Sequence, residues 1–195
     1  MLVGSDLVKI IVGLGNPGKN YEKTRHNVGF YFLDEYLKKN NIVNAKSKFN
    51  GIYFEHIING EKIIFLKPQS YMNLSGEVIK KFVDYFRIDI DNILVVSDDM
   101  ALSVGNYRLR SSGSCGGHNG LRNIEMTLGT SKFKRLRIGI SSAQGCDIKD
   151  YVLGKFSNDD LLVYDEMLVL ISNIIDDFLI MDFDRLMNKY NRKNR

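Results

Sequence analysis

An apolar run that leads directly into a glycine-rich turn and then into a helix constrains the fold of this chain more than any other feature. The run covers residues 7–14 and overlaps the turn Gly13-Leu14-Gly15-Asn16-Pro17-Gly18. Continuous apolar residues of this length predict a buried strand, and glycines allow the backbone to approach another segment or a ligand closely. Residues 28–39 then carry apolar side chains at helical spacing. A buried strand followed by a helix is the unit from which α/β folds are built.

The alternation of strands and helices continues along the chain. Strands are predicted at 50–58 and 62–66, because Asn59-Gly60 between them is a strong hairpin signal. The remaining predictions are helices at 70–86, 121–128, 159–178 and 184–190, and strands at 93–96, 107–110 and 135–140. The chain shows no internal repeat and no low-complexity linker. We therefore expect residues 1–195 to form a single α/β domain, in which a mixed, twisted β-sheet is flanked by helices on both faces.

The composition is that of a globular protein in a reducing compartment. The chain has a formal net charge of +4 and only two cysteines, Cys115 and Cys146, so no disulfide framework is expected. The apolar segment near the N-terminus has no basic region ahead of it, and carboxylates interrupt the apolar residues of 161–181. These features predict a cytoplasmic protein without a signal peptide or a membrane span. We also expect a monomer, because no surplus apolar stripe stands out.

Polar side chains stand where several of the predicted strands end. Asn16, Asn73 and Asp98 each lie at or after the end of a strand, and His118 opens a helix after a glycine-rich segment. In open α/β sheets, ligands bind beyond the carboxyl ends of the strands, where helix N-termini also direct amide donors. The convergence of these segments predicts a functional site at one edge of the sheet.

His26 is the candidate base of this site. Histidine is the side chain best suited to move a proton near neutral pH, and His26 lies close in sequence to Asn16. A carboxylate such as Asp98 beside a histidine fixes its tautomer and stabilises the imidazolium that forms. Amide side chains can hold a peptide-like chain and polarise its carbonyl, because each offers a donor and an acceptor. These groups suit direct attack by an activated water molecule on an acyl or ester carbon.

Other chemistries have weaker support in the residues. The glycines of the turn match the dinucleotide fingerprint, but the acidic residue that should end a second strand is missing. Asp98 and Asp99 could hold a metal ion, although the sequence offers no third ligand at suitable spacing. No serine occupies a G-x-S-x-G elbow, and Cys115 is interpreted as a small residue in a tight turn. The sequence therefore predicts a site with no cofactor and no metal ion.

Long segments of the chain resemble the signature sequences of bacterial peptidyl-tRNA hydrolases. They are GLGNPGxxYxxTRHNxG (residues 13–29), KPQSYMNLSG (67–76), DDM (98–100) and GSCGGHNGL (113–121), followed in the family's order by RLRIGI (135–140) and VLGKF (152–156). The resemblance covers nearly the whole chain. It implies hydrolysis of the ester bond between a peptide, or an N-blocked aminoacyl group, and the 3′ ribose of tRNA. This reaction recycles tRNA from prematurely released peptidyl-tRNA.

The resemblance also implies a role for individual residues. His26 would be the catalytic base, Asp98 would orient it, and Asn16 would position the peptide and the attacking water molecule. The residues implied in substrate binding are Tyr21, Tyr71, Met72, Asn73, His118 and Asn119. Those implied in binding the tRNA 5′-phosphate are Arg110 and Arg137, with Arg108 nearby.

A non-catalytic tRNA- or RNA-binding protein on the same fold is the alternative, because a fold does not by itself determine an activity. Such a protein could lose the base or the amides without unfolding. This chain has His26, Asp98, Asn16, Asn73 and Asn119. The sequence therefore favours the enzyme.

Overall fold

Strand β1 (Val8–Gly13) runs through the centre of the sheet, because its side chains at residues 10–12 are apolar on both faces. Residues 10–12 are completely buried. On one side β1 pairs in parallel with β4 (Glu61–Pro68), and on the other with β5 (Ile93–Asp99). Parallel strands buried on both faces are typical of α/β proteins whose sheets are covered by helices.

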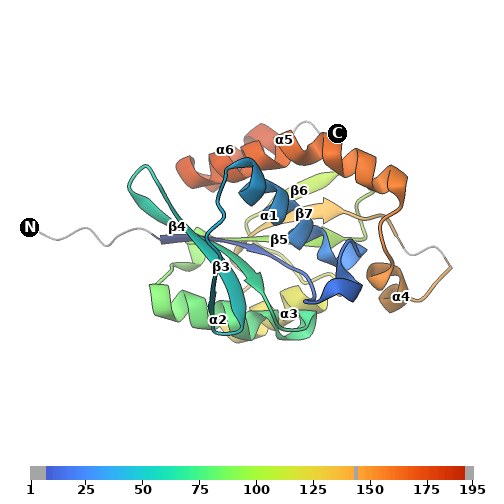
Figure 1. The fold of residues 1–195 in the computed structure, drawn as a ribbon, viewed down its shortest axis with the longest axis horizontal. Coiled ribbons are helices and arrows are strands. Elements are labelled where there is room, and N and C mark those ends of the chain that lie inside the picture. Colours follow the sequence, from blue (N-terminus) through green and yellow to red (C-terminus); the bar gives the residue numbers. More distant parts are fainter. Residues whose placement is uncertain (1–7, 143–144, 192–195) are drawn as a thin grey trace, which may run out of the picture.

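The computed structural model describes residues 8–142 and 145–191, and in this part of the chain one seven-stranded sheet has the order β2-β3-β4-β1-β5-β7-β6 (Figure 1). The remaining strands are β2 (Lys46–Lys48), β3 (Gly51–Ile58), β6 (Tyr107–Arg110) and β7 (Lys134–Gly139). β7 is parallel to β5, whereas β3 and β6 are antiparallel to β4 and β7. The sheet is therefore mixed, as predicted, and the carboxyl ends of β4, β1, β5 and β7 share one edge.

Helices cover both faces of this sheet, which confirms the predicted layers (Figure 1). On one face lie α1 (Val28–Lys39), α5 (Asn158–Ile180) and α6 (Phe183–Tyr190), and on the other lie α2 (Ser75–Phe86) and α3 (Asn119–Leu128). The short helix α4 (Ile148–Leu153) lies at the carboxyl edge of the strands. Short 3₁₀ helices cover Lys19–Tyr21, Arg25–Asn27, Met72–Leu74 and Ile90–Asn92.

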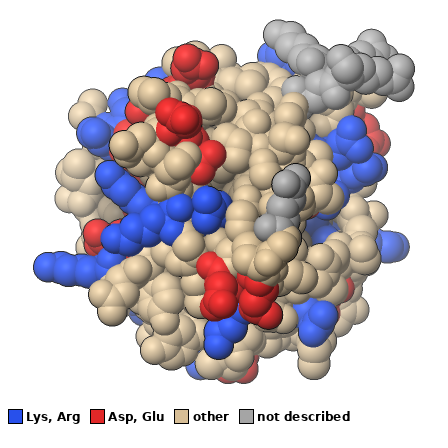
Figure 2. Space-filling model, turned by 90° about the vertical axis from the view of Figure 1, so that its right-hand side faces the viewer, with Lys and Arg blue, Asp and Glu red and all other residues tan. Residues whose placement is uncertain are grey.

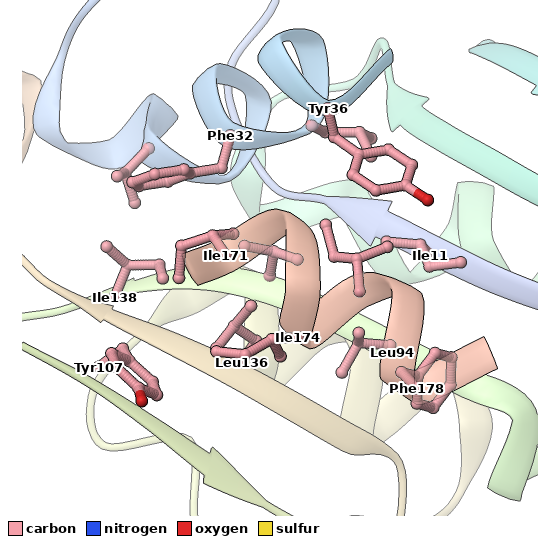
Figure 3. Packing of buried hydrophobic residues seen from close by; sticks show 14 of the residues in the cluster. Ile11, Phe32, Tyr36, Leu94, Tyr107, Leu136, Ile138, Ile171, Ile174 and Phe178 are labelled. Atoms are coloured by element: carbon pink, nitrogen blue, oxygen red, sulfur yellow. The ribbon is translucent and has the colours of Figure 1, made fainter. Parts of the chain in front are cut away.

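Each helical layer buries its own apolar cluster against the sheet. Figure 3 shows part of the cluster beneath α1 and α5, where helix and strand side chains interdigitate: Phe32, Tyr36, Ile171, Ile174, Phe178, Ile11, Leu94, Leu136 and Ile138. On the opposite face, α2 packs over the alternate side chains of β1 and β4, among them Ile10 and Ile64. Full burial of each such side chain contributes about 1.5–3 kcal/mol. The two clusters together hold the strand ends in a fixed arrangement.

Helix α1 approaches the sheet closely because Gly29 has no side chain. A Cβ atom at this position would lie 2.4 Å from the carbonyl oxygen of Val96 and 2.5 Å from the backbone nitrogen of Leu14. The Phe30 N–H donates to the Leu14 carbonyl at 3.1 Å and ties the helix to the end of β1. This contact brings the residues just before α1 against the end of β5.

The structure confirms most predicted elements and corrects a few. Helix α2 begins at Ser75 rather than at residue 70, because the N–H of Met72 donates to the side chain of Asn16 and residues 72–74 form a 3₁₀ helix. Asn73 therefore lies before the α-helix rather than in its first turn. β5 extends to Asp99, and β2 and α4 were not predicted from the sequence.

Within residues 8–142 and 145–191, we find no helix with the length and apolar character that a membrane crossing requires. Leu7 of the predicted first strand and the two ends of the predicted 1–195 domain lie outside the described residues.

Candidate active site

A cavity of about 590 Å³ lies where the predicted site residues meet, at the carboxyl edge of the sheet. Figure 2 views the molecule from the side on which α4 lies in Figure 1, and shows several groups of basic side chains with acidic groups between them. The predicted residues that line the cavity are Asn16, Tyr21, His26, Tyr71, Met72, Asn73, Asp98, His118, Asn119 and Arg137. The structure thus brings together every residue expected to act in catalysis or substrate binding.

His26 and His118 both hydrogen-bond to the same oxygen of Asp98. Nδ1 of His26 lies 2.8 Å from Asp98 Oδ1, and Nε2 of His118 lies 2.9 Å from it. The Leu121 N–H donates to Nδ1 of His118 at 3.2 Å, so a neutral His118 carries its proton on Nε2. His26 correspondingly donates from Nδ1 and has its lone pair on Nε2. No described residue hydrogen-bonds to that nitrogen, which makes it the available base of the cavity.

Local backbone contacts hold His26 in this position. It lies in the 3₁₀ helix Arg25–Asn27, directly before α1, and its side chain is buried. The N–H of Arg25 donates to the Gly154 carbonyl at 2.9 Å, and Thr24 forms an isolated β-bridge with Lys155. The imidazole is therefore fixed from two sides, by the end of β5 and by the segment after α4.

The charge of Asp98 determines the titration of His26. Burial by itself lowers the pKa of His26, but the charge of Asp98 and its hydrogen bond offset that effect and raise the pKa above the ordinary 6.5. Burial by itself raises the pKa of Asp98, whereas the two histidines hold it well below its ordinary 3.8. Asp98 is therefore ionised at neutral pH and stabilises a proton on His26.

The side chain of Asn16 is held in one orientation. Its Oδ1 accepts the N–H of Met72 at 2.8 Å, so its NH₂ group is the part left to bind a ligand. The backbone N–H and carbonyl of Asn16 both bond to the side-chain amide of Asn27, each at 2.9 Å. Asn27 directly follows His26 in the GLGNPGxxYxxTRHNxG segment. Its supporting contact with Asn16 was not predicted.

Exposed amide and aromatic side chains line the outer part of the cavity. Asn73 and Asn119 are exposed. Tyr71 is 60% exposed and packs edge-to-face against Tyr21, with 6.4 Å between ring centroids. Met72, in contrast, is buried at the wall. The cavity is thus polar near His26 and offers aromatic faces at its mouth.

Four arginines form a compact array on the adjacent strands β6 and β7, of which β6 is at the edge of the sheet. Arg108 pairs across the antiparallel ladder with Arg137, and Arg110 pairs with Arg135. Residues paired in this way point to the same face of a sheet, and like charges placed opposite each other are destabilising. An array of this kind needs anionic partners.

Carboxylates of the protein neutralise only half of this array. Nη2 of Arg135 lies 2.8 Å from Glu125, and Nη2 of Arg137 lies 2.5 Å from Asp99. No described carboxylate lies within ion-pair distance of the other two arginines. Two guanidinium groups on this face are therefore uncompensated.

A second cavity of about 260 Å³ adjoins this array. It is lined by Arg110, Arg135 and Arg137 together with Ser112, Gly113, Ser114 and Gly116. Arg137 lines both cavities, so the two are neighbours. Arg108 lines neither, although it was expected beside the other phosphate-binding arginines. Arg135, two residues before Arg137 on β7, is 2% exposed.

A metal ion has more potential ligands here than the sequence indicated. The ligand atoms of His26, Asp98 and His118 all lie within 4.8 Å of one another. His118 lies 20 residues beyond Asp98 along the chain, so the sequence did not indicate it as a third ligand. In this structure the facing atoms of the three residues are engaged in hydrogen bonds with one another.

Comparisons with known proteins agree on one family. Residues 10–195 match the family model described as peptidyl-tRNA hydrolase. The peptidyl-tRNA hydrolase of Bacillus cytotoxicus is 44% identical over 185 residues, which cover 94% of this chain and 100% of that protein. The enzyme of Staphylococcus haemolyticus is 44% identical over 186 residues, 94% of this chain and 98% of its own. The crystal structure of the Acinetobacter baumannii peptidyl-tRNA hydrolase superposes with a TM-score of 0.86 at 34% identity and covers 94% of both chains.

Proposed function

The chain belongs to the peptidyl-tRNA hydrolase family and hydrolyses peptidyl-tRNA, and we propose that it does so by direct attack of a water molecule activated by His26. The observation that carries this mechanism is the hydrogen bond from Nδ1 of His26 to Asp98, which leaves Nε2 as a buried base at the cavity. A non-catalytic RNA-binding role is not favoured.

The reaction proceeds through a tetrahedral intermediate at the ester carbon. Nε2 of His26 takes a proton from the water molecule as the oxygen attacks, and Asp98 stabilises the resulting imidazolium. The NH₂ group of Asn16 donates to the developing oxyanion. As the ester C–O bond breaks, His26 returns the proton to the leaving ribose oxygen. The products are the free peptide and tRNA with an intact 3′ hydroxyl.

The substrate is held by the amides and aromatic rings at the mouth of the cavity. Asn73 and Asn119 are exposed, and each can donate to and accept from a peptide backbone. Tyr21 and Tyr71 provide ring faces for the terminal nucleotide or for a side chain of the peptide. Met72 and His118 also line the cavity, together with His26. These roles would place the ester carbon near Nε2 of His26.

The arginine array binds the 5′-phosphate of tRNA. Arg110 and Arg137 line the 260 Å³ cavity, and guanidinium groups hold phosphate through paired donors. Arg110 has no described carboxylate partner, so an anion there would relieve the repulsion within the array. Arg108 contributes charge to the same strand face rather than a contact inside the cavity.

The proposal includes a metal-free reaction, because the ligand atoms of His26, Asp98 and His118 already bond to one another. We also propose that the protein, as a single domain of residues 1–195, is a monomer and that it acts in the cytoplasm. The free thiols of Cys115 and Cys146 fit a reducing compartment.

Release of the acyl group from an N-acetylated, radiolabelled aminoacyl-tRNA tests the mechanism. His26→Ala should lower the rate by roughly 10²–10⁴ at unchanged circular dichroism. His56→Ala is the matched control, because His56 lies exposed on β3 and does not line the cavity. A free-amine aminoacyl-tRNA, run in parallel, should remain uncleaved. Full activity in His26→Ala would refute the base assignment, and binding of tRNA without any cleavage by the wild type would favour the non-catalytic alternative.

A further inference from the structure

Arg135 is among the largest buried side chains of the described residues, and its guanidinium group is hydrogen-bonded to the carbonyls of a loop. Nη1 donates to the carbonyl of Ser114 at 2.8 Å, and Nη2 donates to the carbonyl of Gly113 at 2.6 Å. The guanidinium carbon lies 4.4 Å from the centre of the Phe133 ring. Arg135 therefore fixes residues 113–114 through two hydrogen bonds that only a planar, forked donor can make together.

This loop is the wall between the two cavities. Ser114 and Gly116 line both the 590 Å³ cavity and the 260 Å³ cavity. The loop continues into His118, whose N–H donates to the Cys115 carbonyl at 2.9 Å and whose ring bonds to Asp98. The position of the wall thus sets the distance between the phosphate pocket and the histidines.

Three glycines give this wall backbone conformations that other residues rarely adopt. Gly113, Gly116 and Gly117 have φ angles of 148°, 56° and 83°. A Cβ atom added at any of the three would meet nothing within 4 Å, so no neighbouring group packs against the side-chain direction of these positions. The hydrogen bonds from Arg135 replace the missing packing.

We propose that Arg135 is a positioning residue that holds the wall so that a tRNA whose 5′-phosphate occupies the small cavity presents its 3′ ester at His26. The inference rests on the proposed phosphate pocket and hydrolytic site. It assigns Arg135 a role distinct from that of Arg110 and Arg137, which would contact the phosphate itself. Arg135 acts through the loop, so its effect depends on both ends of the substrate being engaged.

The test compares kcat/KM for N-acetylated aminoacyl-tRNA with and without its 5′-phosphate. The wild type should prefer the phosphorylated substrate, and Arg110→Ala should remove this preference. Arg135→Lys keeps the charge beside Glu125 but lacks the fork that reaches both carbonyls. We expect it to reduce the preference about tenfold, since misplacements of about 1 Å carry costs of up to about 10²-fold.

Glu125→Gln is the matched control, because it removes the counter-ion of Arg135 and leaves both loop carbonyls in place. It should retain the preference. A loss of stability alone would lower the rates for the two substrates by the same factor and would not change their ratio. The ratio therefore separates positioning from folding.

A second variant addresses the case in which Arg135→Lys does not fold. Arg135→Met combined with Glu125→Met removes a buried ion pair without leaving either charge alone, a replacement that proteins often tolerate. Its net charge equals that of the wild type, so a change in the overall charge of the protein would not explain a reduced preference. A wild-type preference that survives in both Arg135 variants would overturn this inference and leave the proposed function intact. No preference in an active wild type would overturn the phosphate pocket and this inference together, while the base assignment would stand.

Discussion

The side-chain amide of Asn27 bonds to both backbone polar groups of Asn16, accepting from its N–H and donating to its carbonyl, each at 2.9 Å. Both residues are nearly completely buried. The turn after β1 is therefore closed by a side chain that is positioned by the start of α1. Because Asn27 also directly follows His26, the proposed base and the amide of Asn16 are held by the same local contact.

Asn27→Ala should destabilise the fold and impair the reaction. The change leaves a buried N–H and a buried carbonyl without partners, which costs about 1–3 kcal/mol. Displacement of Asn16 should also lower kcat by about 10-fold to 100-fold. Urea unfolding and acyl release measure the two effects, with Asn20→Ala, an exposed residue of the same loop, as the control. Wild-type values for both quantities in Asn27→Ala would contradict the supporting role.

The pH profile should report the titration of His26. The base must be neutral to accept a proton, so kcat/KM should rise with pH through the pKa of His26, which lies above the ordinary 6.5 because of Asp98. Asp98→Asn removes the charge that raises the pKa of His26, but His26 stays buried. The rising limb of kcat/KM should therefore move to lower pH, and its plateau should fall by about 10⁴-fold. An unchanged limb in Asp98→Asn would show that another group limits the profile.

Arg110→Ala and Arg137→Ala should each flatten the salt dependence of tRNA binding. Loss of one phosphate contact lowers the slope of log K against log salt by roughly 0.7–0.9. Fluorescence titration with a 5′-phosphorylated acceptor-stem hairpin at several salt concentrations measures this slope. Arg185→Ala on α6, which is exposed and lines neither cavity, provides the control. Equal slopes in all three variants and the wild type would mean that these arginines do not contact phosphate.

Gly29→Ala should destabilise the protein even though the added group is only a methyl. The new Cβ atom would lie 2.4 Å from a carbonyl oxygen of β5 and 2.5 Å from a backbone nitrogen of the β1 turn, and neither can move without disturbing the sheet. Overpacking of this kind costs about 1–3 kcal/mol. Thermal unfolding should show a clearly lowered Tm, and a Tm equal to that of the wild type would contradict the close contact between helix and sheet.

The sequence predicts the bounds of several central helices and strands well, because the spacing of their apolar residues indicates the type of each element. Helix α1 and strand β6 have the predicted bounds, and the hairpin of β3 and β4 lies where Asn59-Gly60 indicates. Strand β2 was missed, because Lys46-Ser47-Lys48 has no apolar residue and is a strand only by pairing with β3. Helix α4 was missed because it is short, although Asp147 before it is a recognisable N-cap.

The sequence predicts which residues make up the candidate site, but it does not predict the hydrogen bonds between them. Asn16, His26, Asp98 and His118 were expected at one edge, and the structure places all of them in one cavity. That both histidines share one oxygen of Asp98 depends on tertiary distances that no local pattern encodes.

Arg135 shows where sequence patterns fail. It alternates with Arg137 on β7 and has the same chemistry, yet one is buried and the other lines both cavities. The difference comes from Glu125 and the loop carbonyls, which reach Arg135 from distant segments.

The order of the segments around the large cavity has a consequence for the synthesis of the protein itself. The lining residues extend from Asn16 to Leu153, and β1 finds its partner β5 only after some eighty further residues have been added. While a ribosome is still making the chain, His26 has no Asp98 beside it, and α4 has yet to emerge. An unfinished copy of this enzyme is itself a peptide esterified to tRNA. Because His26 contacts Asp98, and Asp98 contacts His118, the candidate catalytic groups cannot assemble around its own ester until the chain has been made at least as far as His118.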